Sequence, residues 1–344
     1  MRSIHAPSAP SLVAIHAELV STVRPVRSSR PTATISVRVP DSDDIRRSAA
    51  ALARDRTSGA AALACRAARL LRAAARDDGK TLASWQRAVR AAGVAVVRAQ
   101  PAMGSLLNVA DLVFRAAQRP TTAADGGAAV RAVLDAYLAT REAAAGAAAA
   151  RLASCLRPRA ACLTLSSSAV AARAFVVAHR AGRLARLVVA ESRPGREGVK
   201  LAARLAAAGI PVVVIVDALA PAWVERIDAV VVGADAVTPW AVWNKCGTLA
   251  LALAARAARR RCLVVTTADR LVPAGLARRL RVPDVEPEAV LERRDVEVVN
   301  QLFDRTPLDL VTRVVTEEAS RAPAAVRQRL ARRRAATWWR TISA

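Results

Sequence analysis

The hydrophobic pattern changes at Pro158, and this change constrains the fold more than any other feature of the chain. Beyond Pro158, short runs rich in Val, Leu and Ile alternate with helical segments. Buried strands that alternate with helices indicate a parallel sheet with helices on both faces. We therefore expect a Rossmann-like, doubly wound α/β domain over residues 151–325. Its predicted strands are 161–166, 186–192, 211–217, 229–235, 261–267 and 296–299.

The residues before this sheet domain have a helical pattern instead. From Ile45 to about Ala150, Ala, Leu and Arg recur at a spacing of three to four residues, and no strand-like alternation interrupts them. This pattern predicts an all-helical domain over residues 45–150. Turn-forming residues divide it into helices near 77–79, 100–101 and 120–127.

The two ends of the chain have compositions of their own. Residues 1–44 are rich in Ser, Pro, Arg and Ala, which predicts a flexible tail, with an organelle transit peptide as the alternative. We predict that residues 326–344 form a basic helix whose Trp338 and Trp339 pack on the body or on a partner. No apolar run reaches the ~18–20 residues that cross a bilayer, and no signal-peptide core stands out, so we expect a cytoplasmic protein without membrane contact.

The formal net charge of +25 at pH 7 raises the question of a nucleic-acid partner. Of the 53 Lys and Arg residues only three are lysines, and alanine is also over-represented, a skew typical of GC-rich coding sequence. The arginines are dispersed along the helices, and aromatic residues make up only 3% of the chain, too few for base stacking. The composition therefore favours solvated basic faces over a nucleic-acid groove, and it is compatible with an acidic or phosphorylated partner.

Metal and cofactor sites are not supported by the motifs. The five cysteines form no CxxC pair and have no histidine nearby, which argues against zinc. Their odd number and scattered positions are typical of a reducing compartment, where most would be small core residues. The chain has no GxGxxG or Walker-type loop, so we expect no dinucleotide or nucleoside-triphosphate cofactor.

Ligands of doubly wound sheets bind beyond the carboxyl ends of the strands, so polar residues at those ends are the candidate site. Asn244 and Lys245 stand out for a different reason. The whole chain holds only three asparagines and three lysines, and here one of each is adjacent. In a composition that has lost most Asn and Lys, we expect the remaining ones to be required chemically. The other strand-end candidates are Ser166–Ser168, Glu191–Arg193, Asp217, Asp235 and Thr266–Thr267.

The segment NKCGT, residues 244–248, precedes a predicted helix. Amide groups at a helix start and the helix dipole both favour an anion. Gly247 allows a close backbone approach, and Lys245 adds a positive charge. Asn244 can donate to a phosphate or sugar oxygen, and Thr248 can cap the helix. The alternative is a capped helix with an incidental lysine.

Two further strand ends have two interpretations each. Arg193 can bind a carboxylate or phosphate through two parallel hydrogen bonds, or form a structural salt bridge with Glu191 or Asp217. Phosphate binding and capping of the next helix are the two interpretations of the serine run, Ser166, Ser167 and Ser168.

Six segments, taken in order, resemble one known family. They are DRTSGAAALACRAARLL (55–71), RAQPAMGSLLN (98–108), ESRPGREGVKLAARLAAAGIPVVVIVDA (191–218), IDAVVVGADAV (227–237), NKCGTLALALAA (244–255) and VVNQLFDRTPLDLVTRVVTEE (298–318). They resemble the initiation factor 2B-related family. That family includes the α, β and δ subunits of eukaryotic translation initiation factor 2B and the isomerases of methylthioribose 1-phosphate and ribose 1,5-bisphosphate. The resemblance implies a helical domain, a Rossmann-like domain, and a homodimer or larger homo-oligomer.

For the isomerases of the family, the resemblance implies ring opening and movement of a proton between adjacent carbons by an Asp–Cys pair. Asp235 matches the aspartate, and Asn244 and Lys245 match the ligand-binding pair that follows it. The cysteine position falls at Ser166, whose hydroxyl is a far weaker acid than a thiol. Losing one acid–base residue lowers a rate by ~10²–10⁴.

The helical domain departs from the pattern of the isomerases as well. Ser58 and Gln100 stand where the resemblance implies arginines that hold phosphate. Arg56 and Arg98, each two residues away, are the candidates to replace them.

We therefore expect a regulatory or non-catalytic protein that, like the initiation factor subunits, binds a phosphorylated sugar or nucleotide. The first alternative is an aldose–ketose isomerase acting on a ribose 1-phosphate-type substrate, with Asp235 and Ser166 as acid–base groups. The second alternative is a scaffold whose basic surface docks an acidic partner.

Overall fold

The N-terminal part of the structure is helical, as its sequence pattern predicts. The computed structural model describes residues 42–342 except 56, 283 and 294, and all of them belong to one unit of the chain, Pro40–Ala344. Residues 1–41 of the predicted tail, 1–44, lie outside the described residues. The helices are α1 (Ser42–Arg54), α2 (Ala60–Ala74), α3 (Leu82–Ala99), α4 (Gly104–Ala117) and α5 (Ala123–Cys155).

Capping residues explain where two of these helices begin. Thr81 Oγ1 accepts a hydrogen bond from the Ser84 amide at 3.3 Å before α3, and Thr122 Oγ1 accepts one from the Asp125 amide at 3.1 Å before α5. Alanine and leucine, both strong helix formers, fill much of the interiors. Helix α5 passes through the boundary predicted at residue 150, and the division into two domains stays a prediction.

Strands and helices alternate over most of the remaining chain. The elements are β1 (Ala160–Leu165), α6 (Ala169–Arg180), β2 (Leu184–Ala190), α7 (Glu197–Ala207), β3 (Val212–Ile215), α8 (Ala220–Trp223), β4 (Ala229–Val232), β5 (Ala236–Val237), β6 (Ala241–Lys245), α9 (Thr248–Ala257), β7 (Arg261–Val265), α10 (Ala274–Ala277), β8 (Phe303–Pro307), β9 (Arg313–Val315), β10 (Ser320–Arg321) and α11 (Pro323–Arg332).

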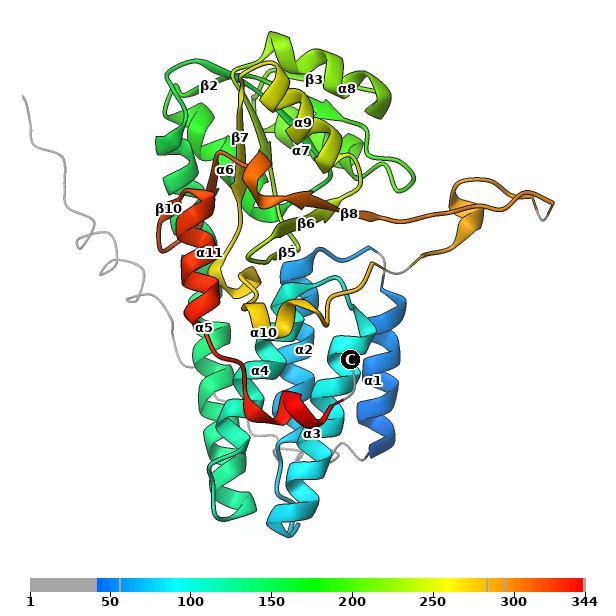
Figure 1. Cartoon of the computed structure of the whole chain (residues 1–344), viewed down its shortest axis with the longest axis vertical. Helices are drawn as coiled ribbons and strands as arrows, with labels where there is room; N and C mark the ends of the chain where they lie inside the picture. Colours follow the sequence, from blue (N-terminus) through cyan, green and yellow to red (C-terminus); the bar gives the residue numbers. More distant parts are fainter. Residues whose placement is uncertain (1–41, 56, 283, 294, 343–344) are drawn as a thin grey trace, which may run out of the picture. The chain divides into compact units, whose positions relative to one another are not determined.

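The main sheet has seven strands in the order β10-β9-β7-β4-β1-β2-β3. Neighbouring strands are parallel except β9 and β10. One apolar cluster packs α5, α6 and α7 on one face, and a second packs α8, α9 and α11 on the other (Figure 1). Helices on both faces of a mostly parallel sheet confirm the predicted α/β fold class, a helical region followed by a doubly wound sheet.

A second, antiparallel sheet of β5, β6 and β8 lies beyond the carboxyl end of β4. Nothing in the sequence predicts it, because its first hairpin has a two-residue strand and no Asn-Gly or Asp-Gly turn. Asn244 and Lys245 are the last residues of β6, where they pair with Asp304 and Phe303 of β8. The pair that the composition singles out is therefore held in a strand.

The strand predicted at 296–299 is wrong. These residues form no regular element, and Val296 and Val299 are 45% and 68% exposed. β-Branched residues form a strand only where a neighbour supplies hydrogen bonds and a surface to pack on. The other five predicted runs each overlap an observed strand.

The C-terminal helix is shorter than predicted, since α11 ends at Arg332. A 3₁₀ turn, Thr337–Thr341, follows and packs Trp338 and Trp339 against Phe114, with ring centroids 5.3 and 4.7 Å apart. The Trp339 Nε1 donates to the buried carboxylate of Asp111 at 2.9 Å. The end of the described chain is thus anchored on the helical region. None of the helices described here is both long and apolar enough to span a bilayer.

Candidate functional site

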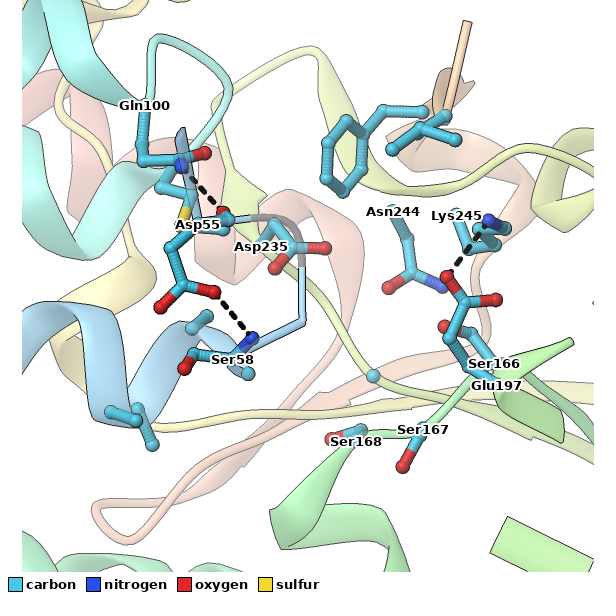
Figure 2. A pocket seen from close by; sticks show the side chains of 18 of the residues that line it. Asp55, Ser58, Gln100, Ser166, Ser167, Ser168, Glu197, Asp235, Asn244 and Lys245 are labelled. Carbon is cyan, nitrogen blue, oxygen red and sulfur yellow. Dashed lines mark hydrogen bonds and ion pairs between the residues drawn. The ribbon is translucent and has the colours of Figure 1, made fainter. Parts of the chain in front are cut away.

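A cavity of about 630 Å³ lies where the carboxyl ends of β1 and β4 face the start of α2 and the loop between α3 and α4. We call it the site cavity. Figure 2 shows that side chains from both regions of the chain point into it. Its lining includes seven of the residues that the sequence predicts for a ligand site. They are Arg98, Ser166, Ser167, Ser168, Asp235, Asn244 and Lys245.

Asp235 lies between β4 and β5, and hydrogen bonds fix its backbone on both sides. Its amide donates to the Trp243 carbonyl at 2.8 Å, and its carbonyl accepts from the Gly104 amide at 2.9 Å. Burial raises the pKa of the Asp235 carboxyl above its ordinary value, although the Arg270 guanidinium and the Lys245 ammonium oppose this. A carboxyl group held in this way can give a proton to a ligand oxygen, so it suits a general acid.

Asn244 and Lys245 are both buried at the wall of the cavity. The Asn244 Nδ2 donates to Thr248 Oγ1 at 2.9 Å, which fixes the amide and leaves its oxygen for another donor. The Lys245 Nζ lies 3.2 Å from Glu197 Oε1 and forms an ion pair with it. Asn244 and Lys245 therefore sit where the sequence places a ligand, and Lys245 already has an anionic partner from the chain.

The loop after β1 brings the three serines to the cavity in three different roles. Ser166 has φ +62°, and its amide donates to Ser192 Oγ at 2.6 Å. Ser168 Oγ caps α6 by accepting from the Ala171 amide at 3.3 Å, so the capping interpretation holds for this residue. Ser167 Oγ accepts from Arg204 Nη2 at 3.0 Å.

A glycine allows this loop to approach β4 closely. A Cβ added to Gly233 would lie 2.6 Å from the Cβ of Ser168, a distance that real side chains essentially never show. Any other residue at 233 would push the serine loop away from Asp235 and Asn244. Gly233 and Ser168 both line the cavity, so this contact shapes its wall.

The helical side of the cavity is built around Asp55. Its Oδ1 accepts from the amides of Thr57 at 3.0 Å and Ser58 at 2.8 Å, and Oδ2 forms an ion pair with Arg66. Burial works against ionisation, but hydrogen bonds from Ser58, Thr57 and Arg66 hold the pKa of Asp55 well below its usual range. Asp55 thus shapes the loop that leads into α2.

The two positions that depart from the isomerases have structural partners on this side. Gln100 Nε2 donates to the carbonyls of Leu52 at 2.9 Å and Asp55 at 3.0 Å, and Ser58 Oγ accepts from Arg66 Nη2 at 2.9 Å. Of the two candidate replacements, Arg98 is exposed and lines the cavity, and Arg56 lies outside the described residues.

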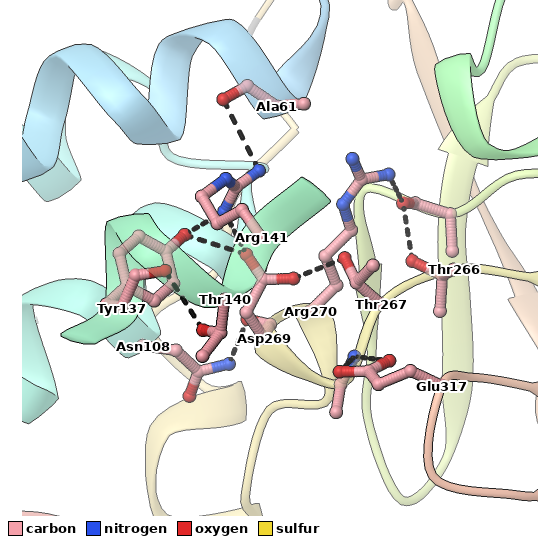
Figure 3. Close-up of polar contacts among 12 residues, drawn as sticks. Ala61, Asn108, Tyr137, Thr140, Arg141, Thr266, Thr267, Asp269, Arg270 and Glu317 are labelled. Atoms are coloured by element: carbon pink, nitrogen blue, oxygen red, sulfur yellow. Dashed lines mark hydrogen bonds and ion pairs between the residues drawn. The ribbon is translucent and has the colours of Figure 1, made fainter. Parts of the chain in front are cut away.

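A buried polar network positions the cavity wall formed by the loop after β7 (Figure 3). The Asp269 carboxylate accepts from Tyr137 Oη and Arg141 Nη1, both at 2.8 Å, and Arg141 Nη2 reaches the Ala61 carbonyl at 3.3 Å. Burial opposes ionisation of Asp269, but Arg270 and Arg141 hold its pKa below the ordinary value. The network ties α5 to the start of α2 and to the loop that carries Arg270.

Arg270 places a guanidinium inside the cavity wall. It is only 4% exposed, and its Nη1 donates to the Ala234 carbonyl at 2.6 Å. Its Nε is buried and has no hydrogen-bond partner in the described part of the chain. Arg270 therefore adds positive charge next to Asp235.

Gly247 and Thr248 do not reach the cavity. Asp304 Oδ2 accepts from the amides of Gly247 at 2.9 Å and Leu249 at 3.0 Å, so a carboxylate of the chain occupies the start of α9. Thr248 Oγ1 donates to the Lys245 carbonyl at 2.6 Å and holds the end of β6. The anion expected at this helix start is thus supplied internally.

Arg193 does not line the cavity either. Its side chain is exposed, and its amide donates to Asp217 Oδ2 at 2.7 Å. The expected contact with Asp217 exists, but it is made by the backbone of Arg193.

Sequence reasoning missed several charged residues of the cavity. Glu197 is the first residue of α7, where an acidic residue is ordinary. Arg204 and Arg270 are hidden among the many arginines of this composition. The only sequence signal for Arg270 is its place just after the strand-end pair Thr266–Thr267. Among the residues that the structure describes, His, Cys, Asp and Glu side chains do not gather in threes that could hold a metal ion.

The chain belongs to the initiation factor 2 subunit family, whose family model matches residues 56–322. Among curated relatives, ribose 1,5-bisphosphate isomerase of Archaeoglobus fulgidus is 35% identical over 162 residues, which cover 45% of this chain and 51% of that protein. Methylthioribose-1-phosphate isomerase of Synechocystis is 37% identical over 155 residues, which cover 42% of this chain and 44% of that one. The chain spans about half the length of the curated relatives it matches.

Solved structures agree on the fold over a longer range. A translation initiation factor eIF-2B from Pyrococcus horikoshii superposes with a TM-score of 0.71 at 26% identity, covering 82% of this chain and 98% of that chain. The tetrameric eIF2B β2δ2 complex of C. thermophilum gives a TM-score of 0.64 at 20% identity, covering 83% and 93%, and this likeness shows the fold alone.

Proposed function

We propose that this chain binds a phosphorylated sugar of the ribose 1-phosphate class in the site cavity and converts it from the aldose to the ketose form. The observation that carries the proposal is the shared cavity of Asp235, Asn244 and Lys245, with the pKa of Asp235 raised by burial. Both curated relatives described above are named as isomerases of such sugars, and this supports the substrate class.

Isomerisation needs one group that protonates the ring oxygen and one that moves a proton from C2 to C1. Asp235 fits the first role because a buried carboxyl holds its proton at higher pH than a solvated one. Ser166, in the loop after β1, also lines the cavity, and its hydroxyl is a weak base. We therefore expect turnover to be ~10²–10⁴-fold slower than with a thiol at this position.

A specific observation favours a second candidate, a ligand-binding protein without turnover. Gln100 and Ser58 hold backbone and side-chain partners of the helical region, so neither supplies a charge to a phosphate. Together with Ser166, these two residues fit a regulatory role in which the sugar phosphate or a nucleotide is bound and kept. The same proposal includes a homodimer or larger assembly, which sedimentation velocity measures directly.

Phosphorus NMR distinguishes the two candidates. The protein is incubated separately with methylthioribose 1-phosphate and ribose 1,5-bisphosphate, and the wild type is compared with Asp235→Asn. The isomerase proposal predicts a new ketose phosphate resonance with the wild type and a rate at least ~10²-fold lower with the variant. Binding without any new resonance supports the regulatory candidate. If neither compound binds, the isomerase proposal is wrong and the regulatory candidate is restricted to a nucleotide ligand.

A further inference from the structure

The ion pair between Lys245 and Glu197 is the least expected feature of the cavity. The Lys245 side chain is 5% exposed, and its Nζ lies 3.2 Å from Glu197 Oε1. The other carboxylate oxygen, Glu197 Oε2, is buried and has no hydrogen-bond partner in the described part of the chain. The pair lies at the wall from which a ligand would be bound (Figure 2).

A purely structural role explains this pair poorly. A glutamate in the first turn of a helix stabilises it through the dipole, but an exposed carboxylate does this as well. Here the Glu197 side chain, which is 33% exposed, turns toward the buried Lys245 of β6, and its second oxygen has no hydrogen-bond partner in the described part of the chain. An ion pair with one buried partner and one unsatisfied carboxylate oxygen is a poor source of stability. The pair is better explained by a ligand that completes it.

We propose that Glu197 determines the specificity of the site by competing with phosphate for Lys245. This inference rests on the proposed function. Because Nζ and Oε1 are 3.2 Å apart, a phosphate oxygen bound to Lys245 would lie close to the Glu197 carboxylate. The two like charges would repel each other, because both would lie against the same buried ammonium group.

A hydroxyl group suits the same place. It can accept a hydrogen bond from the Lys245 ammonium and donate one to a Glu197 oxygen. It therefore satisfies the hydrogen bonding of both side chains without adding charge. The cavity then binds a sugar monophosphate with a hydroxyl at Glu197 and Lys245, while the phosphate meets the other cations of the lining, Arg98, Arg204 and Arg270. A bisphosphate whose second phosphate falls at Lys245 is discriminated against, because Glu197 repels it.

The test measures binding of inorganic phosphate by isothermal titration calorimetry. In Glu197→Gln the lysine is freed and the shape is kept, so we expect phosphate to bind at least tenfold tighter than to the wild type. The gain must disappear in the double variant Glu197→Gln with Lys245→Met, because it depends on the lysine. Glu191→Gln is the matched control, since Glu191 lies in the same β2–α7 connection without lining the cavity. Its phosphate affinity should equal that of the wild type.

An unchanged or weaker affinity in Glu197→Gln overturns the proposal, and so does a gain that persists without Lys245. Glu197→Ala is measured in parallel and melting curves are recorded for every variant, so that a folding defect is not read as lost binding. Failure of this inference leaves sugar-phosphate binding by the wild type standing. If Glu197→Gln gains phosphate affinity but the wild type binds no sugar phosphate, competition is supported and the proposed function falls.

Discussion

Burial of the Asp235 carboxyl affects both the stability of the fold and the acidity of the residue. Its backbone is fixed by Trp243 and Gly104, and burial of its carboxyl raises its pKa. Arg270 and Lys245 lower the pKa again, but they do not cancel the effect of burial. A carboxyl that resists ionisation is useful as an acid, and it makes the folded state less stable once it does ionise.

Replacing Asp235 should therefore change the pH dependence of stability. Between the ordinary carboxyl pKa, about 4, and the raised pKa of Asp235, the folded chain keeps a proton that the unfolded chain has released. The wild type therefore loses stability as pH rises through this window, and Asp235→Asn does not. We expect the melting temperature of the variant, relative to the wild type, to rise with pH from about 4 upward.

Thermal melts of both proteins between about pH 4 and 8 check this, since the window begins at the ordinary carboxyl pKa. A constant difference between the two melting temperatures would show that Asp235 has an ordinary pKa.

Rare residues predicted the cavity better than common ones did. Asn244 and Lys245 stand out in the sequence because the chain has so few of either type, and both line the cavity. Glu197 and Arg270 could not be found in this way, because one resembles a first-turn helix acid and the other is one arginine among many. Their roles depend on side chains that meet across the fold, and no local pattern encodes this.

The start of α9 is the element whose surroundings differ most from expectation. Asp304 of β8 accepts hydrogen bonds from the amides of Gly247 and Leu249, so the helix needs no external anion. Gly247 has φ +101°, a conformation that glycine adopts without strain and that turns the chain from β6 into α9. A carboxylate distant in sequence thus caps a helix that its own residues leave uncapped.

We expect Asp304→Ala to lower the free energy of unfolding by about 1–2 kcal/mol, the usual effect of losing a helix cap. Asp309→Ala is the control. Asp309 is 74% exposed and forms a surface ion pair with Arg327, so its loss should change the free energy by less than about 0.5 kcal/mol. Urea denaturation of the three proteins measures both values. Equal effects of the two substitutions would show that Asp304 does not act as a cap.

Elements with a strong local signal were predicted and the others were not. The five parallel strands over residues 160–265 follow apolar runs, and four of them are buried over most of their length, whereas β3 at the sheet edge is partly exposed. The small sheet of β5, β6 and β8 was missed, since its strands pair across a long stretch of chain and are partly polar. The run at 296–299 has the right composition but lacks a partner strand, so it failed as a prediction.

At the scale of the whole molecule, the site cavity depends on both regions of the chain. The strand ends supply Asp235, Asn244 and Lys245, and the helical region supplies Asp55 and Arg98. The network around Asp269 and the anchored Trp339 hold the two regions together. The fold class was predictable from hydrophobic periodicity, whereas the position of one region on the other depends on contacts between residues far apart in sequence.

The central claim is that a phosphorylated sugar binds in this cavity. Calorimetric titration of Asp235→Asn with methylthioribose 1-phosphate tests it most directly, because this variant should bind the sugar without consuming it. We predict one site per chain with a dissociation constant between about 1 μM and 1 mM, weakened at least tenfold when Asn244→Ala is added. Absence of binding heat at millimolar sugar phosphate, or equal affinity with and without Asn244, would contradict the account.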